Sequence, residues 1–314
     1  MSEKLKLGIR IAVSLICFVV VFSLIDINKI SSLLKDIQFE IILLALLFML
    51  LGHVGSGLRF HFIVNRLKRK LSQPGAIKVS FVALWFNQLL PTGMGGDVVR
   101  AIMLAKTCGR ARVILSALLD RILGLLWMIL MLLVFVPMAL TSWLGSDVTI
   151  VIGVACSVAL FAGFSPVWIK KRFCKLSSNR NLYNMCRFLS LLGHAMRLVV
   201  LTSTFYKLVF YLALSFVPYV IYVSLLGYSF GLELTLLEYL AVVPVIFIAM
   251  QFPISIGGWG VRELAALYVF SYMGISEEVA VIISILYGFG LLVTSIPGNF
   301  FWIQTRHNTS SATA

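Results

Sequence analysis

The amino-acid sequence predicts an all-α, polytopic membrane protein that is built from two inverted repeats. Its 314 residues are 61% hydrophobic and only 12% charged, a composition typical of membrane proteins with several spans. Apolar stretches long enough to cross about 30 Å of hydrocarbon recur along the chain. The pattern Pro-x-x-x-Gly-Gly-x-x-x-Arg occurs once in each half, at residues 91–100 and 253–262. Interrupted hydrophobic segments at corresponding positions are typical of transporters with inverted repeats.

Six apolar segments predict full spans, because each can cross the hydrocarbon core as a helix. They are residues 8–25, 40–58, 113–140, 148–168, 198–226 and 279–302. Two further segments, residues 76–106 and 236–274, are interrupted by proline and glycine, which end helices. Each predicts a short helix, a break at Pro91–Gly96 or at Pro253–Gly260, and a second short helix.

The charged residues predict how these segments are oriented. Of the 26 Lys and Arg residues, 21 fall in residues 1–10, 59–78, 100–112, 169–197 and 303–314, and most acidic residues fall in the other loops. Basic clusters in alternate loops follow the positive-inside rule and argue against a nucleic-acid partner, although the net charge is +14. We therefore expect a multi-pass protein of the bacterial inner (cytoplasmic) membrane with both termini in the cytoplasm and Glu277–Glu278 outside.

This orientation gives the two halves the same order of segments in opposite directions. Repeat one, about residues 8–140, starts in the cytoplasm, and repeat two, about residues 148–302, starts outside. We expect a single membrane domain, residues 1–314, with about six full spans and two oppositely oriented re-entrant hairpins. Eight complete spans are the alternative, because they preserve the same charge pattern.

The two breaks are the predicted substrate-binding site. An irregular turn at membrane depth is tolerated only where it is buried in protein or lines a wet cavity. Gly95–Gly96 and Gly257–Gly258 let a ligand approach the backbone, and each pair precedes a helix whose free N–H groups and dipole favour phosphate. Arg100 and Arg262 lie one turn further on, where a guanidinium can bind phosphate through two bonds. The alternative is that the glycines serve helix packing and the arginines extend to the membrane interface.

Four more charged residues are candidates for coupling or for structural ion pairs. Asp97 and Glu263 flank the two turns, and Asp120 and Arg121 lie within the third apolar segment. Charges inside a membrane span pair with other charges or serve function. Since adjacent helical residues point to different faces, we expect Asp120 to pair with Arg100. Arg121 is expected to pair with Asp97 or Glu263.

Polar residues near the breaks are candidates for lining a cavity. Asn87 and Gln88 precede the first break and Gln251 precedes the second, where each can hydrogen-bond a head group or the interrupted backbone. Lys207 stands among apolar and aromatic residues and either lines the cavity or extends to the interface. His53 is expected to make a helix–helix contact. We predict no catalytic residues, no metal site and no cofactor, since the sequence has no nucleotide-binding or hydrolase motif and no metal-ligand spacing.

Three separated motifs occur in the order LLPTGMGGDVVRAIML, ALLDRILGL and PISIGGWGVRELA. Together they resemble the lysylphosphatidylglycerol synthase transmembrane-region family, also called flippase-like integral membrane proteins, over about residues 8–302. In the best-known members this region precedes a soluble domain that makes aminoacyl-phosphatidylglycerol, and the membrane region is held to move the lipid between leaflets. We expect no soluble synthase domain here, so the resemblance implies lipid handling rather than lipid aminoacylation.

These expectations combine into a membrane lipid flippase-like transporter. We predict that it moves an anionic phospholipid or a lipid-linked sugar phosphate between leaflets, with lipids that carry phosphate head groups as its partners. The alternatives are a membrane-embedded glycosyl or acyl transferase, and an accessory subunit of a lipid or cell-envelope polysaccharide synthase. An accessory subunit would bind a partner synthase or glycosyltransferase. A homo-oligomer is also compatible with the sequence.

Overall fold

The computed structural model describes residues 38–67, 70–90, 95–139, 180–201, 203–251, 255 and 257–310, with scattered positions between residues 12 and 33 and between 151 and 157. Every regular element in this part of the chain is an α-helix. The helices are α3 (Phe39–Arg66), α4 (Gln73–Leu89), α5 (Gly95–Cys108), α6 (Arg110–Ala139), α9 (Arg180–Val200), α10 (Phe205–Ser229), α11 (Leu236–Gln251), α12 (Val261–Ser271) and α13 (Glu277–Ser310). Most of the expected span 148–168 and part of the expected span 8–25 lie outside the described residues, as do residues 91–94 and 252–254 of the two breaks.

Four of the described helices are long and apolar enough to cross a membrane. They are Phe39–Arg66, Arg110–Ala139, Phe205–Ser229 and Glu277–Thr305. Their outer surfaces expose large apolar side chains such as Leu47, Val134 and Phe300, which a soluble protein would bury or cover. The chain is therefore an all-helical integral membrane protein, as its composition predicts.

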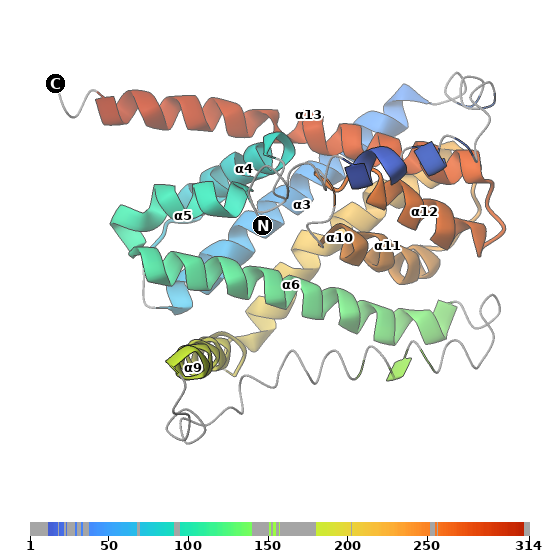
Figure 1. Cartoon of the computed structure of the whole chain (residues 1–314). Coiled ribbons are helices and arrows are strands. Elements are labelled where there is room, and N and C mark those ends of the chain that lie inside the picture. Colours follow the sequence, from blue (N-terminus) through green and yellow to red (C-terminus); the bar gives the residue numbers. More distant parts are fainter. Residues whose placement is uncertain are drawn as a thin grey trace.

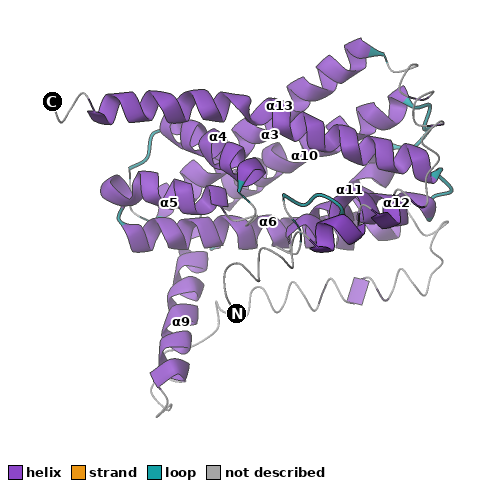
Figure 2. Ribbon diagram, turned by 45° about the horizontal axis from the view of Figure 1, so that its top comes forward, coloured by secondary structure: helices purple, strands orange, loops and turns teal. Residues whose placement is uncertain are grey.

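Two antiparallel helices, α3 and α10, cross the centre of the molecule side by side (Figure 1). Gly52 of α3 lies against the ring of Tyr219, and Gly55 lies against the backbone of Leu214. Small residues of this kind let membrane helices approach closely enough for backbone and side-chain packing to hold them together. The long helices α6 and α13 run antiparallel to each other on opposite sides of this central pair (Figures 1 and 2).

The two interrupted segments form antiparallel helical hairpins. α4 packs against α5, and α11 packs against α12. These helices have 17, 14, 16 and 11 residues, whereas a full span needs about 20 residues. In Figure 1, α4 and α11 enter the bundle from opposite ends, and both stop near its middle.

The contacts between helices in one half recur in the other half. α4 packs against α13, the last helix of the second half, and α11 packs against α6, the last helix of the first half. Likewise, α3 contacts α4 and α6, and α10 contacts α11 and α13. Each hairpin is therefore held between the central pair and the long helix of the opposite half.

Basic and acidic residues concentrate at opposite ends of the bundle. The end of α3, the end of α5 and the start of α6 lie at the same end as the C-terminus (Figure 1). Arg66 is in the last turn of α3, and α6 begins at Arg110. At the other end, Glu40, Glu238 and Glu277 occupy the first turns of α3, α11 and α13. This separation of charge fits the sequence-based assignment of the loops to two sides of a membrane.

Helix α9 lies across the basic end of α6 instead of along the bundle (Figure 2). Leu192, Met196 and Val199 form its buried stripe and belong to the cluster that includes Leu119 of α6 and Leu212 of α10. A stripe with this spacing is typical of an amphipathic helix that lies in a membrane interface. α9 ends at Val200 and α10 begins at Phe205, so the expected span 198–226 starts later than the sequence suggests.

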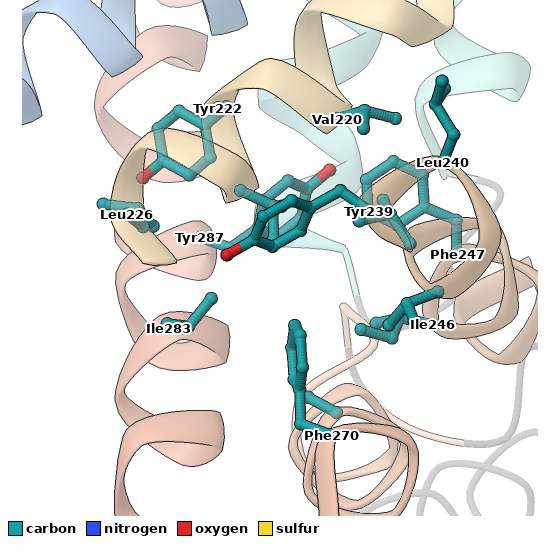
Figure 3. Packing of buried hydrophobic residues seen from close by; sticks show 14 of the residues in the cluster. Val220, Tyr222, Leu226, Tyr239, Leu240, Ile246, Phe247, Phe270, Ile283 and Tyr287 are labelled. Atoms are coloured by element: carbon teal, nitrogen blue, oxygen red, sulfur yellow. The ribbon is translucent and has the colours of Figure 1, made fainter. Parts of the chain in front are cut away.

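Aromatic side chains fill the space between the second hairpin and the long helices. Tyr222, Phe247, Phe270 and Tyr287 come from α10, α11, α12 and α13 and belong to one buried cluster (Figure 3). The ring centroids of Phe247 and Tyr287 are 5.2 Å apart, and those of Tyr222 and Tyr287 are 5.7 Å apart. Such pairs contribute roughly 0.5–1.5 kcal/mol beyond the area they bury. The cluster fixes α11 and α13 at the wall of the cavity described next.

Candidate functional site

A cavity of about 270 Å³ lies between the two halves of the protein. Side chains from α3, α4, α6, α10, α11 and α13 line it. Asn87 precedes the first break and Gln251 precedes the second, and both line this cavity. Gln88 and Lys207, which the sequence also suggests for this position, are not among its lining residues.

Arg59 is the lining residue that brings a positive charge to this cavity. Its Nε donates a hydrogen bond to Oδ1 of Asp120 at 2.7 Å, and its Nη1 donates to Oγ of Ser215 at 2.8 Å. Within the described part of the chain, no group accepts a hydrogen bond from Nη2. These N–H groups therefore remain for a ligand in the cavity.

The sequence-based assignment of Arg59 to the basic stretch 59–78 is wrong. α3 continues without a break to Arg66, so Arg59 lies inside a spanning helix and is not in a loop. The apolar residues that follow Arg59, Phe60 to Val64 with one histidine, were the available signal that the helix continues. A charge within such a helix is a functional candidate by default.

Arg59 begins a chain of ion pairs that leads to the first hairpin. Nη1 of Arg100 lies 3.6 Å from Oδ2 of Asp120, and its Nη2 lies 3.3 Å from Oδ1 of Asp97. Oδ2 of Asp97 in turn accepts a hydrogen bond from Nε of Arg121 at 2.5 Å. Asp120 thus pairs with Arg100, and Arg121 pairs with Asp97. Among the described residues, these contacts join three arginines to two aspartates, and Arg59 is the member of the chain that faces the cavity.

Arg100 is buried and incompletely hydrogen-bonded. It is 7% exposed, and its guanidinium carbon lies 4.2 Å from the ring centroid of Phe60. Nε and Nη1 have no hydrogen-bond partner among the described residues. A buried donor without a partner costs roughly 1–3 kcal/mol, so a phosphate oxygen that reached this guanidinium would be stabilised. Arg100 does not line the central cavity, and its contact with a lipid stays a prediction.

Arg262 is held more completely than Arg100. Its Nη2 donates to Oε1 of Glu263 at 2.5 Å, and its Nε lies 3.2 Å from Oγ of Ser284. Its guanidinium carbon lies 4.4 Å from the ring centroid of Trp259. The side chains of Arg262 and Glu263 are 1% and 0% exposed. The corresponding arginines of the two repeated patterns therefore have different surroundings, and a direct contact of Arg262 with phosphate stays a prediction.

The two glycine pairs have different backbone conformations. Gly95 and Gly96 are the first two residues of helix α5. Gly257 and Gly258 have φ angles of +59° and +81°, in the left-handed region that L side chains rarely occupy. The two turns therefore need glycine for different reasons: the second for its backbone angles, and the first for the close approach described below.

Side chains already occupy some of the N–H groups at the starts of the two helices. The N–H of Gly96 donates to Oδ1 of Asn87 at 2.8 Å, and the N–H of Gly260 donates to Oε2 of Glu263 at 2.6 Å. A carboxylate at this position of a helix is a common cap. The phosphate site expected at these helix starts is therefore partly filled by the protein's own oxygens.

Valine at Gly96 or at Gly258 is expected to lower the thermal unfolding temperature of the purified protein. A Cβ at Gly96 would overlap the carbonyl oxygen of Ala83 and lie 2.8 Å from Cγ of Asn87, and Gly258 has positive φ. Overpacking and backbone strain each cost roughly 1–3 kcal/mol. The matched control is Gly153→Val, since a Cβ there meets no atom of the described residues within 4 Å. Equal unfolding temperatures for the three variants would show that neither turn requires glycine.

His53 and Lys207 lie apart from the ion-pair chain. Nδ1 of His53 lies 2.6 Å from the hydroxyl of Tyr219, and Nε2 lies 2.8 Å from Oγ1 of Thr294, so His53 joins α3, α10 and α13. Lys207 is exposed on the first turn of α10, with Nζ 5.9 Å from the ring centroid of Tyr206. No three His, Cys, Asp or Glu side chains in the described ranges are placed to hold a metal ion.

The matched family is that of the lysylphosphatidylglycerol synthase transmembrane region, whose model covers residues 7–298. No curated protein and no solved structure matches the chain significantly. The matched range contains both hairpins, both copies of the repeated pattern and every residue that lines the central cavity. The chain therefore belongs to the family of the lysylphosphatidylglycerol synthase transmembrane region.

Proposed function

We propose that this protein moves an anionic phospholipid or a lipid-linked sugar phosphate between the two leaflets of the membrane. The observation that carries this proposal is the cavity between the two halves, into which Arg59 presents a guanidinium with free N–H groups. Family membership supports a lipid-related role for the membrane region. The cavity adds a place where a phosphate head group can be held away from the hydrocarbon.

The polar groups of the cavity suit a phosphate. Besides Arg59, the indole Nε1 of Trp127 is buried without a hydrogen-bond partner in the described structure, and Trp127 lines the cavity. Gln251 adds an amide that can also donate. The positive charge of Arg59 at the cavity favours an anion, because interactions between charges strengthen where water is scarce. A phosphate oxygen is the acceptor that these donors would bind.

The size of the cavity suits a head group and not a whole lipid. At about 270 Å³ it falls just below the range of about 300–1,000 Å³ typical of sites that enclose small-molecule ligands. The acyl chains would therefore remain in the bilayer while the head group passes between the helices. This arrangement avoids exposing the phosphate to hydrocarbon, which costs several kcal/mol for a charged group.

We further propose that the halves are inverted repeats, about residues 8–140 and 148–302, with two re-entrant hairpins. The short helices of the hairpins and the reciprocal packing of α4 on α13 and of α11 on α6 support this arrangement. In transporters of this kind, one repeat rocks against the other around a fixed site near the midplane. Such a movement would bring Arg100, Arg262 and the glycine turns into contact with the head group in part of the cycle.

A transport assay in vesicles tests the proposed function. The purified protein is reconstituted with fluorescent phosphatidylglycerol or with fluorescent phosphatidylcholine, and an impermeant reductant quenches the probe in the outer leaflet. We expect the protected inner-leaflet fraction of the anionic probe to fall well below its value in protein-free vesicles. The zwitterionic probe is expected to cross more slowly. Protection equal to that of protein-free vesicles for the anionic probe and for a lipid-linked sugar phosphate would refute the proposal.

The orientation in the membrane gives a separate prediction. We expect Met185 and both termini in the cytoplasm and Glu277 outside, because the basic residues cluster in alternate loops of the sequence. Single cysteines at positions 185 and 277, in a background without the five native cysteines, are treated with an impermeant thiol reagent on intact cells. Labelling is expected at position 277 and absent at position 185. The reverse pattern would invert the proposed topology.

A further inference from the structure

A second cavity, of about 730 Å³, lies between α5 and α6, apart from the central one. Its α6 wall is one helical face, formed by Arg110, Ile114, Ala117, Leu118 and Arg121. Its α5 wall is formed by Asp97, Val98, Ala101, Ile102 and Ala105. Most of these side chains are apolar, and the charged ones, Arg110 at one end and Arg121 with Asp97 at the other, lie at the two ends of the cavity. We refer to this cavity as the α5–α6 groove.

The groove faces the surroundings of the protein and not its core. Val98, Ile102 and Ile114 on its walls are 57%, 66% and 51% exposed, so they would contact the acyl chains of a bilayer. Small side chains at positions 101, 105 and 117 leave the space between these exposed residues open. An apolar groove with this composition suits a hydrocarbon chain better than a polar ligand.

The arginines at the two ends of the groove differ in whether an acidic residue pairs with them. At the inner end, Arg121 is paired with Asp97. At the outer end, Arg110 is the first residue of α6, is exposed, and has no ion pair with any described residue. The start of α6, which is Arg110, lies at the basic end of the bundle (Figure 1). An anionic group that seats at Arg110 would compensate a charge that the described protein leaves free.

The length of the groove matches one leaflet. Arg110 and Arg121 are eleven residues apart, which is about 16 Å along an α-helix, and half of the hydrocarbon core is about 15 Å thick. A lipid with its phosphate at Arg110 would therefore place an acyl chain along Ile114 and Leu118 and end it near the level of Arg121. The spacing of charge and apolar surface is that of a phospholipid.

From these observations we infer that the α5–α6 groove binds an anionic phospholipid of the leaflet at the basic end of the bundle, with its phosphate at Arg110 and one acyl chain between α5 and α6. This binding does not depend on whether the protein moves lipids. It differs from the central cavity in its residues and in holding the acyl chain as well as the head group.

Native mass spectrometry of the purified protein, titrated with phosphatidylglycerol or phosphatidylcholine, tests the inference. Arg110→Gln is expected to weaken retention of phosphatidylglycerol about fivefold, as the removal of one cation near a membrane phosphate predicts. Retention of phosphatidylcholine should change less. The matched control is Arg112→Gln, since Arg112 is exposed on the same helix end and does not line the groove. Equal retention by the two variants would overturn the inference.

A filled groove gives an independent test. Ala105→Phe is expected to reduce retention of both lipids, whereas Ala111→Phe should not, because Ala111 is exposed outside the groove. Wild-type retention of both lipids by Ala105→Phe would overturn the inference.

Disulfide crosslinking tests whether a second copy of the chain occupies the groove. Crosslinks between two copies carrying Ile102→Cys in vesicles would overturn the inference, since a second copy would then lie in the groove. The two proposals can fail separately. If Arg110→Gln and Ala105→Phe lose lipid binding while the wild-type protein transports no lipid, the groove is a lipid site and the proposed transport function is refuted.

Discussion

Replacing Arg59 by glutamine is expected to slow lipid transport by roughly tenfold to a hundredfold, in line with the 1.5–3 kcal/mol of a hydrogen bond to a charged group. The substitution removes the cation that faces the cavity and the ion pair that this cation makes with Asp120. The fold should persist, because Asp120 keeps Arg100 as a partner. The initial rate of loss of the protected phosphatidylglycerol probe in vesicles is the measurement.

Two further variants make the Arg59 experiment specific. Arg59→Lys keeps the charge but loses the planar fork of donors, so it should restore only part of the rate. Arg66→Gln is the control on the same helix, since Arg66 packs 5.2 Å from the ring centroid of Phe62 and does not line the cavity. Transport at the wild-type rate in Arg59→Gln would make Arg59 a structural residue.

Replacing Arg262 by methionine is expected to destabilise the protein by roughly 3–5 kcal/mol, because it leaves the carboxylate of Glu263 buried without its cation. Arg262 and Glu263 are both almost fully buried and directly bonded. The double variant Arg262→Met/Glu263→Gln should recover most of the loss, since no unpaired charge is then buried. Thermal unfolding in detergent, followed by intrinsic fluorescence, compares the single and double variants. A double variant that unfolds below the single one would contradict this account of the pair.

The Arg262 result also separates two roles that the sequence leaves together. A side chain that only binds substrate would, when removed, abolish transport and leave the unfolding temperature unchanged. The contacts of Arg262 with Glu263, Ser284 and Trp259 predict a loss of stability in addition to any loss of transport. Arg100, which has incompletely satisfied donors, should show the smaller loss of stability on replacement.

The helices of the hairpins were predictable from the sequence because proline and glycine act locally. The sequence places the ends of the first limbs at Leu90 and Phe252, and the structure ends α4 at Leu89 and α11 at Gln251. Each break carries residues that cannot continue a helix at low cost. The alternation of basic and acidic loops could also be predicted from the sequence, because it depends only on the positions of charged residues along the chain.

The position of Arg59 was not predictable by the same means. Hydropathy and the positive-inside rule both end the second span where the first cation occurs, and neither detects a partner on another helix. Asp120 and Ser215, from α6 and α10, stabilise the cation within α3. The different backbone angles at Gly95 and Gly257 were also hidden, because both copies of the pattern have the same residues at the glycine positions.

A cavity at Arg59 that serves as a passage between the leaflets must be reachable from both sides of the membrane. Ser56 lines this cavity one turn before Arg59, and Ser56→Cys in a background without native cysteines places a single small thiol there. Vesicles containing this variant are treated with an impermeant maleimide from the outside alone or from the inside alone. We expect the thiol to react from each side, and either reaction to stop transport of phosphatidylglycerol. Reaction from only one side, or full transport after complete modification, would contradict a passage at Arg59.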